Sequence, residues 1–244
     1  MPPGALKFNF SLKKCIFLWI NALKGNILIQ NMPLSYISKL GGDVKLGFWQ
    51  MGESSEALLK ICALHPYEFD DFAAIHHEKV KRQWLSTRLL AQKMCGDKAQ
   101  VYYDDYGKPH CFGFGGISIS HSGDYVLLAT DPNNPIGVDI ELISQKIIRV
   151  KDKFISLEEE ELFEYIRNEK LFMFYHLVWS FKEAAYKLYG KKGLIFKKHI
   201  ILKELHTHEL NTINGVLIIN NKEVEITGNF LFIGGYVICT CKYK

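Results

Sequence analysis

The sequence lacks the cysteine pairs that mark zinc sites and disulfide-rich folds. Its six cysteines are scattered over 244 residues, and none forms a Cys-x-x-Cys pair. Cys239 and Cys241 alternate along a predicted strand, so they share a face but are poorly placed to bond to each other. We therefore expect reduced thiols in a cytoplasmic protein, with no zinc site.

A large charge excess is also missing. The formal net charge of +4 suits an anionic partner but is too small for a dedicated nucleic-acid binder. Hydrophobic residues make up 48% and charged residues 23% of the chain, which is ordinary for a globular protein. A chain of this length can form one large domain or two small lobes, and no low-complexity linker divides it.

No apolar run near the N-terminus is long enough to span a bilayer. The stretch KKCIFLWINALKG faintly resembles a signal peptide, but Asn21 interrupts its apolar run and no clear cleavage site follows. Met32 opens a stretch that reads like the start of a domain. We expect residues 1–31 to be an N-terminal extension and expect no membrane association.

Helical and strand patterns are mixed along the rest of the chain. Strong helices are predicted over residues 76–96 and 172–190, and alternating strands over 116–122, 124–131 and 136–142. The last quarter predicts antiparallel strands with an Asn-Asn turn at residues 220–221. The turn DPNNP is the best seam between an N-terminal lobe, residues 32–133, and a C-terminal lobe, residues 134–244. Each lobe would pack a small antiparallel sheet on one main helix, which gives an α+β fold.

Three carboxylates carry the first functional signal. Asp139 and Glu141 share one face of a predicted strand, and Glu183 lies on a mostly aromatic helix face. An exposed edge strand would explain the first two, and an i,i+4 pair with Lys187 would explain Glu183. A divalent metal bound by all three is the alternative, and hard oxygen ligands favour Mg²⁺.

Basic and polar residues near these carboxylates suit an anionic ligand. Arg82 and Arg88 lie on the first main helix, with Arg88 in the otherwise apolar stretch WLSTRLLA. Lys108 occupies a Gly-Lys-Pro turn beside backbone amides that can face an anion. Ser120 and His121 end a strand just before the acidic one, where the histidine could reach a phosphate, although a lone histidine is more often structural.

The motifs GKP, ISISHS, GVDIE and WSFKEAAYK, in this order and spacing, resemble the 4'-phosphopantetheinyl transferase superfamily. The resemblance runs from about KRQWLSTRLL to KKGL and is to the larger, single-chain, surfactin-synthetase-activating type with two pseudo-symmetric lobes. It implies transfer of phosphopantetheine from coenzyme A to a serine of an apo acyl or peptidyl carrier protein, with release of 3',5'-ADP.

The resemblance also implies roles for individual residues. Asp139, Glu141 and Glu183 look like magnesium ligands, and Lys187 resembles a lysine that reaches the pyrophosphate. Five further residues fall in segments that hold coenzyme A and its 3'-phosphate: Arg82, Arg88, Lys108, Ser120 and His121. Glu183 or a metal-bound water would take the proton of the attacking serine. Lys182 would make a different contact or face the solvent.

Partners follow from the same resemblance. Carrier proteins of this kind are acidic, so a mildly basic transferase is expected to dock one by charge complementarity. The segment YGKKGLIFKKH is a candidate for part of that surface, and a solvated basic loop is the alternative. The protein is expected to act as a monomer. A magnesium-dependent phosphodiesterase or nuclease, and a non-catalytic module that binds coenzyme A or a carrier protein, stay open as alternative functions.

Overall fold

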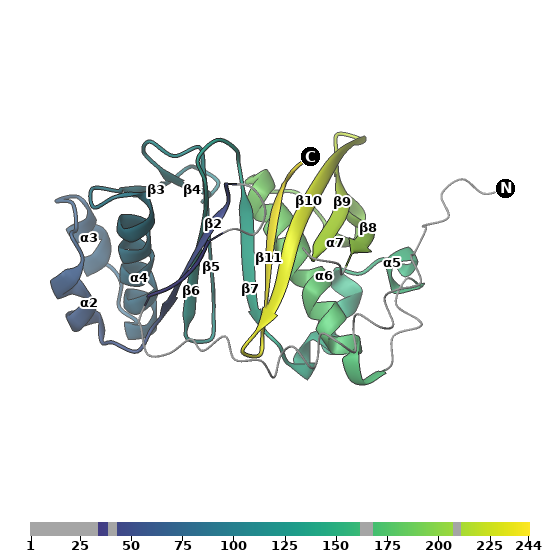
Figure 1. Ribbon diagram of the computed structural model, residues 1–244, viewed down its shortest axis with the longest axis horizontal. Helices are drawn as coiled ribbons and strands as arrows, with labels where there is room; N and C mark the ends of the chain where they lie inside the picture. Colours follow the sequence, from purple (N-terminus) through teal and green to yellow (C-terminus); the bar gives the residue numbers. More distant parts are fainter. Residues whose placement is uncertain (1–33, 39–42, 162–167, 207–210) are drawn as a thin grey trace.

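The structure, a computed structural model, is described here for residues 34–38, 43–161, 168–206 and 211–244. It is built on two antiparallel sheets, and Figure 1 shows main helices lying outside them. The first sheet has the order β1-β2-β6-β5, with strands Leu34–Ser38, Lys45–Gln50, Tyr125–Asp131 and Gly116–Ser122. The second has the order β7-β11-β10-β9-β8, with strands Gly137–Leu142, Tyr236–Tyr243, Lys222–Ile233, Thr212–Ile219 and Ile200–His206. The predicted α+β fold is confirmed.

Three apolar clusters separate the layers. One lies between helix α4 (Glu78–Cys95) and the first sheet and includes Leu85 and Leu89. A second cluster joins the two sheets through Phe48, Leu127 and Val138. The third packs helix α6 (Asn168–Tyr189) on the second sheet. The order of layers is therefore helix, sheet, sheet, helix, as Figure 1 shows.

Shorter elements surround this frame. They are helices α2 (Ser55–Ile61), α3 (Glu68–Ala73), α5 (Leu157–Glu161) and α7 (Phe196–His199), the 3₁₀ helix η1 (Gln145–Lys153), and the hairpin β3–β4 (Val101–Tyr103 and Pro109–Cys111). The hydroxyl of Ser54 caps α2 by accepting a hydrogen bond from the amide of Ala57. The turn at Asn220 and Asn221 has positive φ at both residues, which a two-residue hairpin turn requires. Among the described residues, no helix is both long and apolar enough to cross a membrane.

Serine hydroxyls join the sheets where edge strand β5 runs beside edge strand β7. The backbone amides of Val138 and Ile140 donate to the hydroxyls of Ser118 and Ser120 at 2.9 and 3.3 Å. Farther along, the amide of Leu142 donates to Ser122 at 3.0 Å. The serine side chains thus supply the hydrogen bonds between β5 and β7 that backbone groups supply within a sheet. The turn DPNNP, the predicted boundary between the lobes, connects β6 to β7.

The structure describes five of the six cysteines, and the prediction of free thiols is confirmed for these five. Cys62, Cys95, Cys111, Cys239 and Cys241 are free thiols. Cys239 and Cys241 are both buried on β11, on the face that packs against α6. Cys15 and the predicted extension at residues 1–31 lie outside the described residues.

Candidate active site

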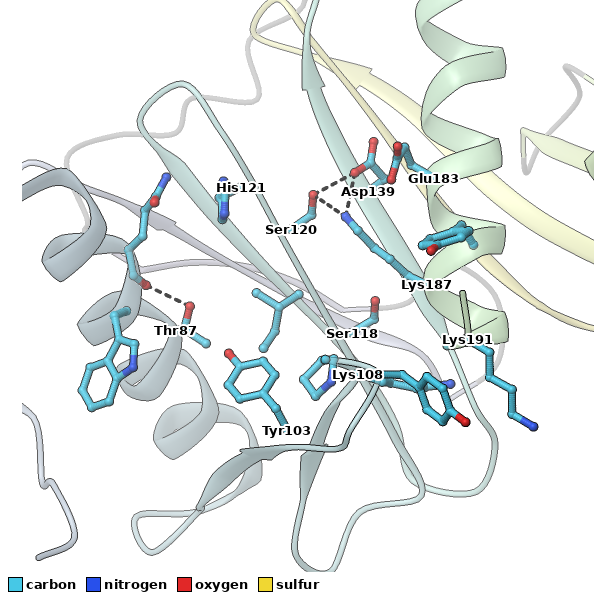
Figure 2. A pocket seen from close by; sticks show the side chains of 18 of the residues that line it. Thr87, Tyr103, Lys108, Ser118, Ser120, His121, Asp139, Glu183, Lys187 and Lys191 are labelled. Atoms are coloured by element: carbon cyan, nitrogen blue, oxygen red, sulfur yellow. Dashed lines mark hydrogen bonds and ion pairs between the residues drawn. The ribbon is translucent and has the colours of Figure 1, made fainter. Parts of the chain in front are cut away.

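A pocket of about 600 Å³ opens between the two halves of the molecule. Its walls come from α4, the β3–β4 hairpin, β5, β7 and α6, so both predicted lobes contribute to it. Asp139, Glu141, Glu183 and Lys187 line one side of the pocket together with Ser120 and His121, and Lys108 lines it from the hairpin. The structure thus brings seven of the nine predicted site residues to one cavity (Figure 2).

Gly137 allows the acidic strand to lie directly against α6. A Cβ atom at this position would collide with the carbonyl of Ala184 and crowd the amide of Leu188. Because the two backbones approach so closely, Asp139 on β7 faces the helix turn that carries Glu183. A strand beginning with any larger residue would have to move away from the helix, and the carboxylates would separate.

Asp139 lies at the centre of the cluster and is only 3% exposed. Its Oδ1 atom accepts hydrogen bonds from the hydroxyl of Ser120 and the ammonium of Lys187, both at 2.8 Å (Figure 2). The ammonium of Lys187 also donates to the Ser120 hydroxyl at 2.8 Å. Lys187 therefore reaches across to β7 and pairs with Asp139, and the expected alternative, a simple helical pair with Glu183, is not the contact that forms.

Glu141 and Glu183 both have raised pKa values, because each is partly buried near the carboxylate of Asp139. Burial and the carboxylate of Asp139 raise the pKa of Glu183 to about 7. The same two causes raise the pKa of Glu141 to about 7, although the indole Nε1 of Trp179 donates to its Oε1 at 2.8 Å. A cation placed among these groups would favour their charged forms.

The three carboxylates suit a hard cation, although in this structure the ammonium of Lys187 contacts Oδ1 of Asp139. Within the described part of the chain, no three His, Cys, Asp or Glu side chains are arranged as a set of metal ligands. Oδ2 of Asp139 is nevertheless buried and has no hydrogen-bond partner there, which is costly for a carboxylate oxygen. An oxygen-ligated cation such as Mg²⁺ would satisfy this atom.

Lys108 lies at the opposite end of the pocket from Asp139, where the hairpin meets the end of α6 (Figure 2). Its backbone amide donates to Oδ1 of Asp104 at 2.9 Å, which stabilises the Gly-Lys-Pro turn. Its ammonium donates to the carbonyl of Leu188 at 2.7 Å. His121 is farther along β5, and desolvation followed by the charge of Lys187 lowers its pKa. It lies next to the last residue of strand β5.

Two predicted ligands are placed elsewhere. Arg88 is 4% exposed and forms a 2.9 Å ion pair with Glu68, which is 2% exposed. Its guanidinium also stacks on Trp84, with Cζ 3.2 Å from the ring centroid. Arg82 donates to the carbonyl of Met51 at 3.2 Å. Neither arginine lines the pocket, because α4 turns their side chains toward neighbouring segments of the same lobe. Their placement gives no support to the prediction that they hold coenzyme A.

Lys182 makes a contact outside the pocket, the first of its two predicted alternatives, and does not face the solvent. The side chain is fully buried, and its ammonium lies 2.6 Å from both Oε2 of Glu159 and the carbonyl of Phe154. The other oxygen of Glu159 accepts from the amide of Leu202 at 2.8 Å. This pair ties α5 and β8 to α6, one residue before Glu183.

Several pocket residues were missed from sequence. Val80, Gln83, Trp84 and Thr87 line the pocket from a single stripe of α4. Val80 is 44% exposed although it is apolar. Their spacing of three and four residues is a helical-face signal that could have identified them. Further lining residues are Tyr103, Tyr106, Tyr186 and Lys191, and Tyr106 directly precedes the Gly-Lys-Pro turn.

Comparison with known proteins agrees with this site. Residues 135–241 match the model of the family described as the 4'-phosphopantetheinyl transferase superfamily. The C-terminal part of the chain is therefore similar to this superfamily. Asp139, Glu141, Glu183 and Lys187 lie inside the matched range, whereas the pocket residues from α4, the hairpin and β5 lie before it.

Individual members of the superfamily are similar to the chain over part of its length. The 4'-phosphopantetheinyl transferase Sfp of Bacillus subtilis (strain 168) is 36% identical over 120 residues, which cover 47% of this chain and 53% of the relative. The psf-1 transferase of Bacillus pumilus is 40% identical over 76 residues, covering 31% and 32%. An L-aminoadipate-semialdehyde dehydrogenase-phosphopantetheinyl transferase of Xenopus laevis is 27% identical over 190 residues, covering 65% and 61%. The chain spans about half the length of the Bacillus subtilis relative.

Proposed function

We propose that this protein is a 4'-phosphopantetheinyl transferase that modifies a serine of an apo acyl or peptidyl carrier protein with coenzyme A as donor. The observation that carries the proposal is the convergence of GVDIE and WSFKEAAYK on one pocket, where Lys187 contacts Asp139 and Glu183 lies beside them (Figure 2). The match of residues 135–241 to the superfamily model and the names of the similar proteins support it.

Charge neutralisation is the main task of such a pocket, because coenzyme A carries a pyrophosphate and a ribose 3'-phosphate. In the proposed arrangement Asp139, Glu141 and Glu183 hold Mg²⁺, which offsets negative charge on the pyrophosphate when bound. Lys187 adds a positive charge on the same side of the pocket. Ser120 keeps Lys187 and Asp139 in place through its hydroxyl, and His121 is the candidate contact for the 3'-phosphate.

The proposed transfer is a displacement at phosphorus. The hydroxyl oxygen of the carrier serine forms a bond to the phosphorus that bears the pantetheine arm. The bond from this phosphorus to 3',5'-ADP breaks, and its electron pair leaves with the ADP oxygen. Glu183, which lines the pocket, is the proposed acceptor of the serine proton. Lys187 stabilises the developing charge.

The two lobes have separate roles in this proposal. Residues 32–133 supply the α4 and hairpin walls, residues 134–244 supply the acidic cluster, and residues 1–31 are an extension outside the catalytic unit. A basic surface follows α6, where Lys191, Lys192, Lys197 and Lys198 are all exposed. We propose that this surface contributes to docking the acidic carrier protein, with the transferase acting as a monomer and without nucleic acid or membrane.

Release of the second product tests the proposed reaction. The protein is incubated with coenzyme A and Mg²⁺, with and without an apo carrier protein, and nucleotides are separated by chromatography. The proposal expects 3',5'-ADP to form only when the carrier with its serine is present. Formation of 3',5'-ADP without a carrier would indicate a phosphodiesterase, and no product at all would indicate a binding module.

A further inference from the structure

The contact between Lys108 and Leu188 connects two walls of the pocket. Lys108 is fixed in the hairpin turn by Asp104, whose Oδ1 accepts from the amides of Tyr106 and Lys108, both at 2.9 Å. Its ammonium then crosses to α6 and donates to the carbonyl of Leu188 at 2.7 Å. The residues joined are 80 positions apart and lie on opposite sides of the predicted seam.

The carbonyl of Leu188 is a suitable acceptor because of its place in the helix. It lies in the last turn of α6, where the helix itself supplies no donor for the final carbonyls. The end of a helix also carries partial negative charge, which favours a cationic side chain there. Lys108 therefore acts as a cap supplied by a distant segment.

Gly190 leaves room for this cap. The residue follows the end of α6 with φ +69, and a Cβ atom there would collide with Cδ of Lys108 and lie 3.1 Å from its ammonium nitrogen. The stem of Lys108 thus packs on the backbone of Gly190. Burial in this position lowers the pKa of Lys108, as expected for an ammonium that is partly removed from water.

We propose that Lys108 is a positioning residue that clamps the β3–β4 hairpin to the end of α6 and so fixes the separation of the pocket walls. The hairpin contributes Tyr103 and Tyr106 to the pocket, and α6 contributes Glu183 and Lys187. In this role Lys108 affects the binding of every ligand that contacts both walls. It does not itself bind the 3'-phosphate of coenzyme A. The ligand named in the test rests on the proposed function.

Comparing coenzyme A with dephospho-coenzyme A distinguishes the clamp from a direct contact between Lys108 and the 3'-phosphate. Binding of coenzyme A and dephospho-coenzyme A is measured by calorimetry for the natural protein, Lys108→Met and Lys108→Arg. The clamp predicts that Lys108→Met weakens both ligands by a similar factor, on the order of tenfold for one charge-assisted hydrogen bond. Lys108→Arg, which keeps a donor on a long side chain, restores most of the affinity. A loss confined to coenzyme A would overturn the clamp and show a phosphate contact.

Hydrogen exchange tests the clamp without any ligand. In the Lys108→Met variant, amides of residues 101–111 and the last turn of α6 are expected to exchange faster, while those of β9 and β10 keep their rates. Unchanged exchange at the hairpin and at α6 would overturn the clamp, whatever the protein binds. If the natural protein binds neither nucleotide, the proposed function fails, and the exchange result still decides on the clamp.

A glycine pair provides a second variant should Lys108→Met not fold. Gly190→Ala introduces both positive-φ strain and a clash with Lys108, whereas Gly193→Ala, with φ +102 and open space around the Cβ position, introduces strain alone. The clamp predicts faster hairpin exchange in Gly190→Ala than in Gly193→Ala. Equal hairpin exchange in the two variants would contradict it.

Discussion

The ammonium of Lys187 on α6 lies 2.8 Å from Oδ1 of Asp139 on β7, and both atoms contact the hydroxyl of Ser120 on β5. This triad joins a strand of the first sheet, a strand of the second sheet and the main helix of the second. Glu141 and Glu183 line the same pocket, and each has a raised pKa. One ammonium and three carboxylates therefore meet at the interface between the two sheets.

Loss of a central carboxylate is expected to stop transfer without unfolding the protein. Asp139→Ala and Glu183→Gln should each lower the transfer rate by roughly a hundredfold or more at saturating Mg²⁺, because charge stabilisation in the transition state is lost. Rates are measured with an apo carrier protein, and circular dichroism confirms folding. Glu223→Gln, which changes an exposed carboxylate on β10, is the control and should keep its rate. Retention of more than about a tenth of the natural rate by either site variant would refute the three-carboxylate site.

Lys182 and Glu159 are expected to behave as a buried pair. Lys182→Met leaves the Glu159 carboxylate buried without its cation and should lower the free energy of unfolding by about 3–5 kcal/mol. The double variant Lys182→Met/Glu159→Leu removes both charges and should recover much of this loss. Urea unfolding of the single and double variants measures the difference. Additive losses in the double variant would show that the two charges are not coupled.

Gly137 is expected to be indispensable for the approach of β7 to α6. Gly137→Ala places a methyl group against the carbonyl of Ala184 and should lower both the stability and the transfer rate, because the strand that carries Asp139 must shift. Gly52→Ala is the matched control, since nothing lies within 4 Å of its Cβ position. Melting temperatures and rates of the two variants are compared. Equal behaviour would contradict the close contact between strand and helix.

Arg88 is expected to stabilise the N-terminal half and not to select the donor. Arg88→Met leaves the Glu68 carboxylate buried without its cation, so the free energy of unfolding should fall by about 3–5 kcal/mol. The ratio of transfer rates from coenzyme A and dephospho-coenzyme A should stay that of the natural protein at a temperature where the variant is folded. If the variant used coenzyme A and dephospho-coenzyme A at more nearly equal rates than the natural protein does, Arg88 would be shown to contact the 3'-phosphate.

The sequence predicts the acidic cluster well because its signals are local. The alternation of Val138 and Asp139 on a strand, and the isolated carboxylate of Glu183 on an apolar helix, are visible within a few residues. The Asn-Asn hairpin turn and the end of α4 at Gly96 are local in the same way. Such features need no knowledge of how the sheets pack.

Partners far apart in the chain could not be predicted in this way. Arg88 pairs with Glu68 and Lys182 with Glu159, and in each case the acidic residue lies on a short helix whose position depends on tertiary packing. Periodicity shows that these cations lie in apolar surroundings, but it does not name the group that neutralises them. For this reason the sequence revealed neither the ion pair of Arg88 with Glu68 nor the contact of Lys108 with the end of α6.

The mass of an intact carrier protein tests the central claim most directly. An apo carrier protein is incubated with coenzyme A, Mg²⁺ and either the natural protein or Asp139→Ala, and its mass is measured by electrospray ionisation. The account predicts that the natural protein adds one phosphopantetheine group to the carrier serine and that the variant adds none. An unchanged carrier mass with the natural protein, across acyl and peptidyl carriers, would contradict the account.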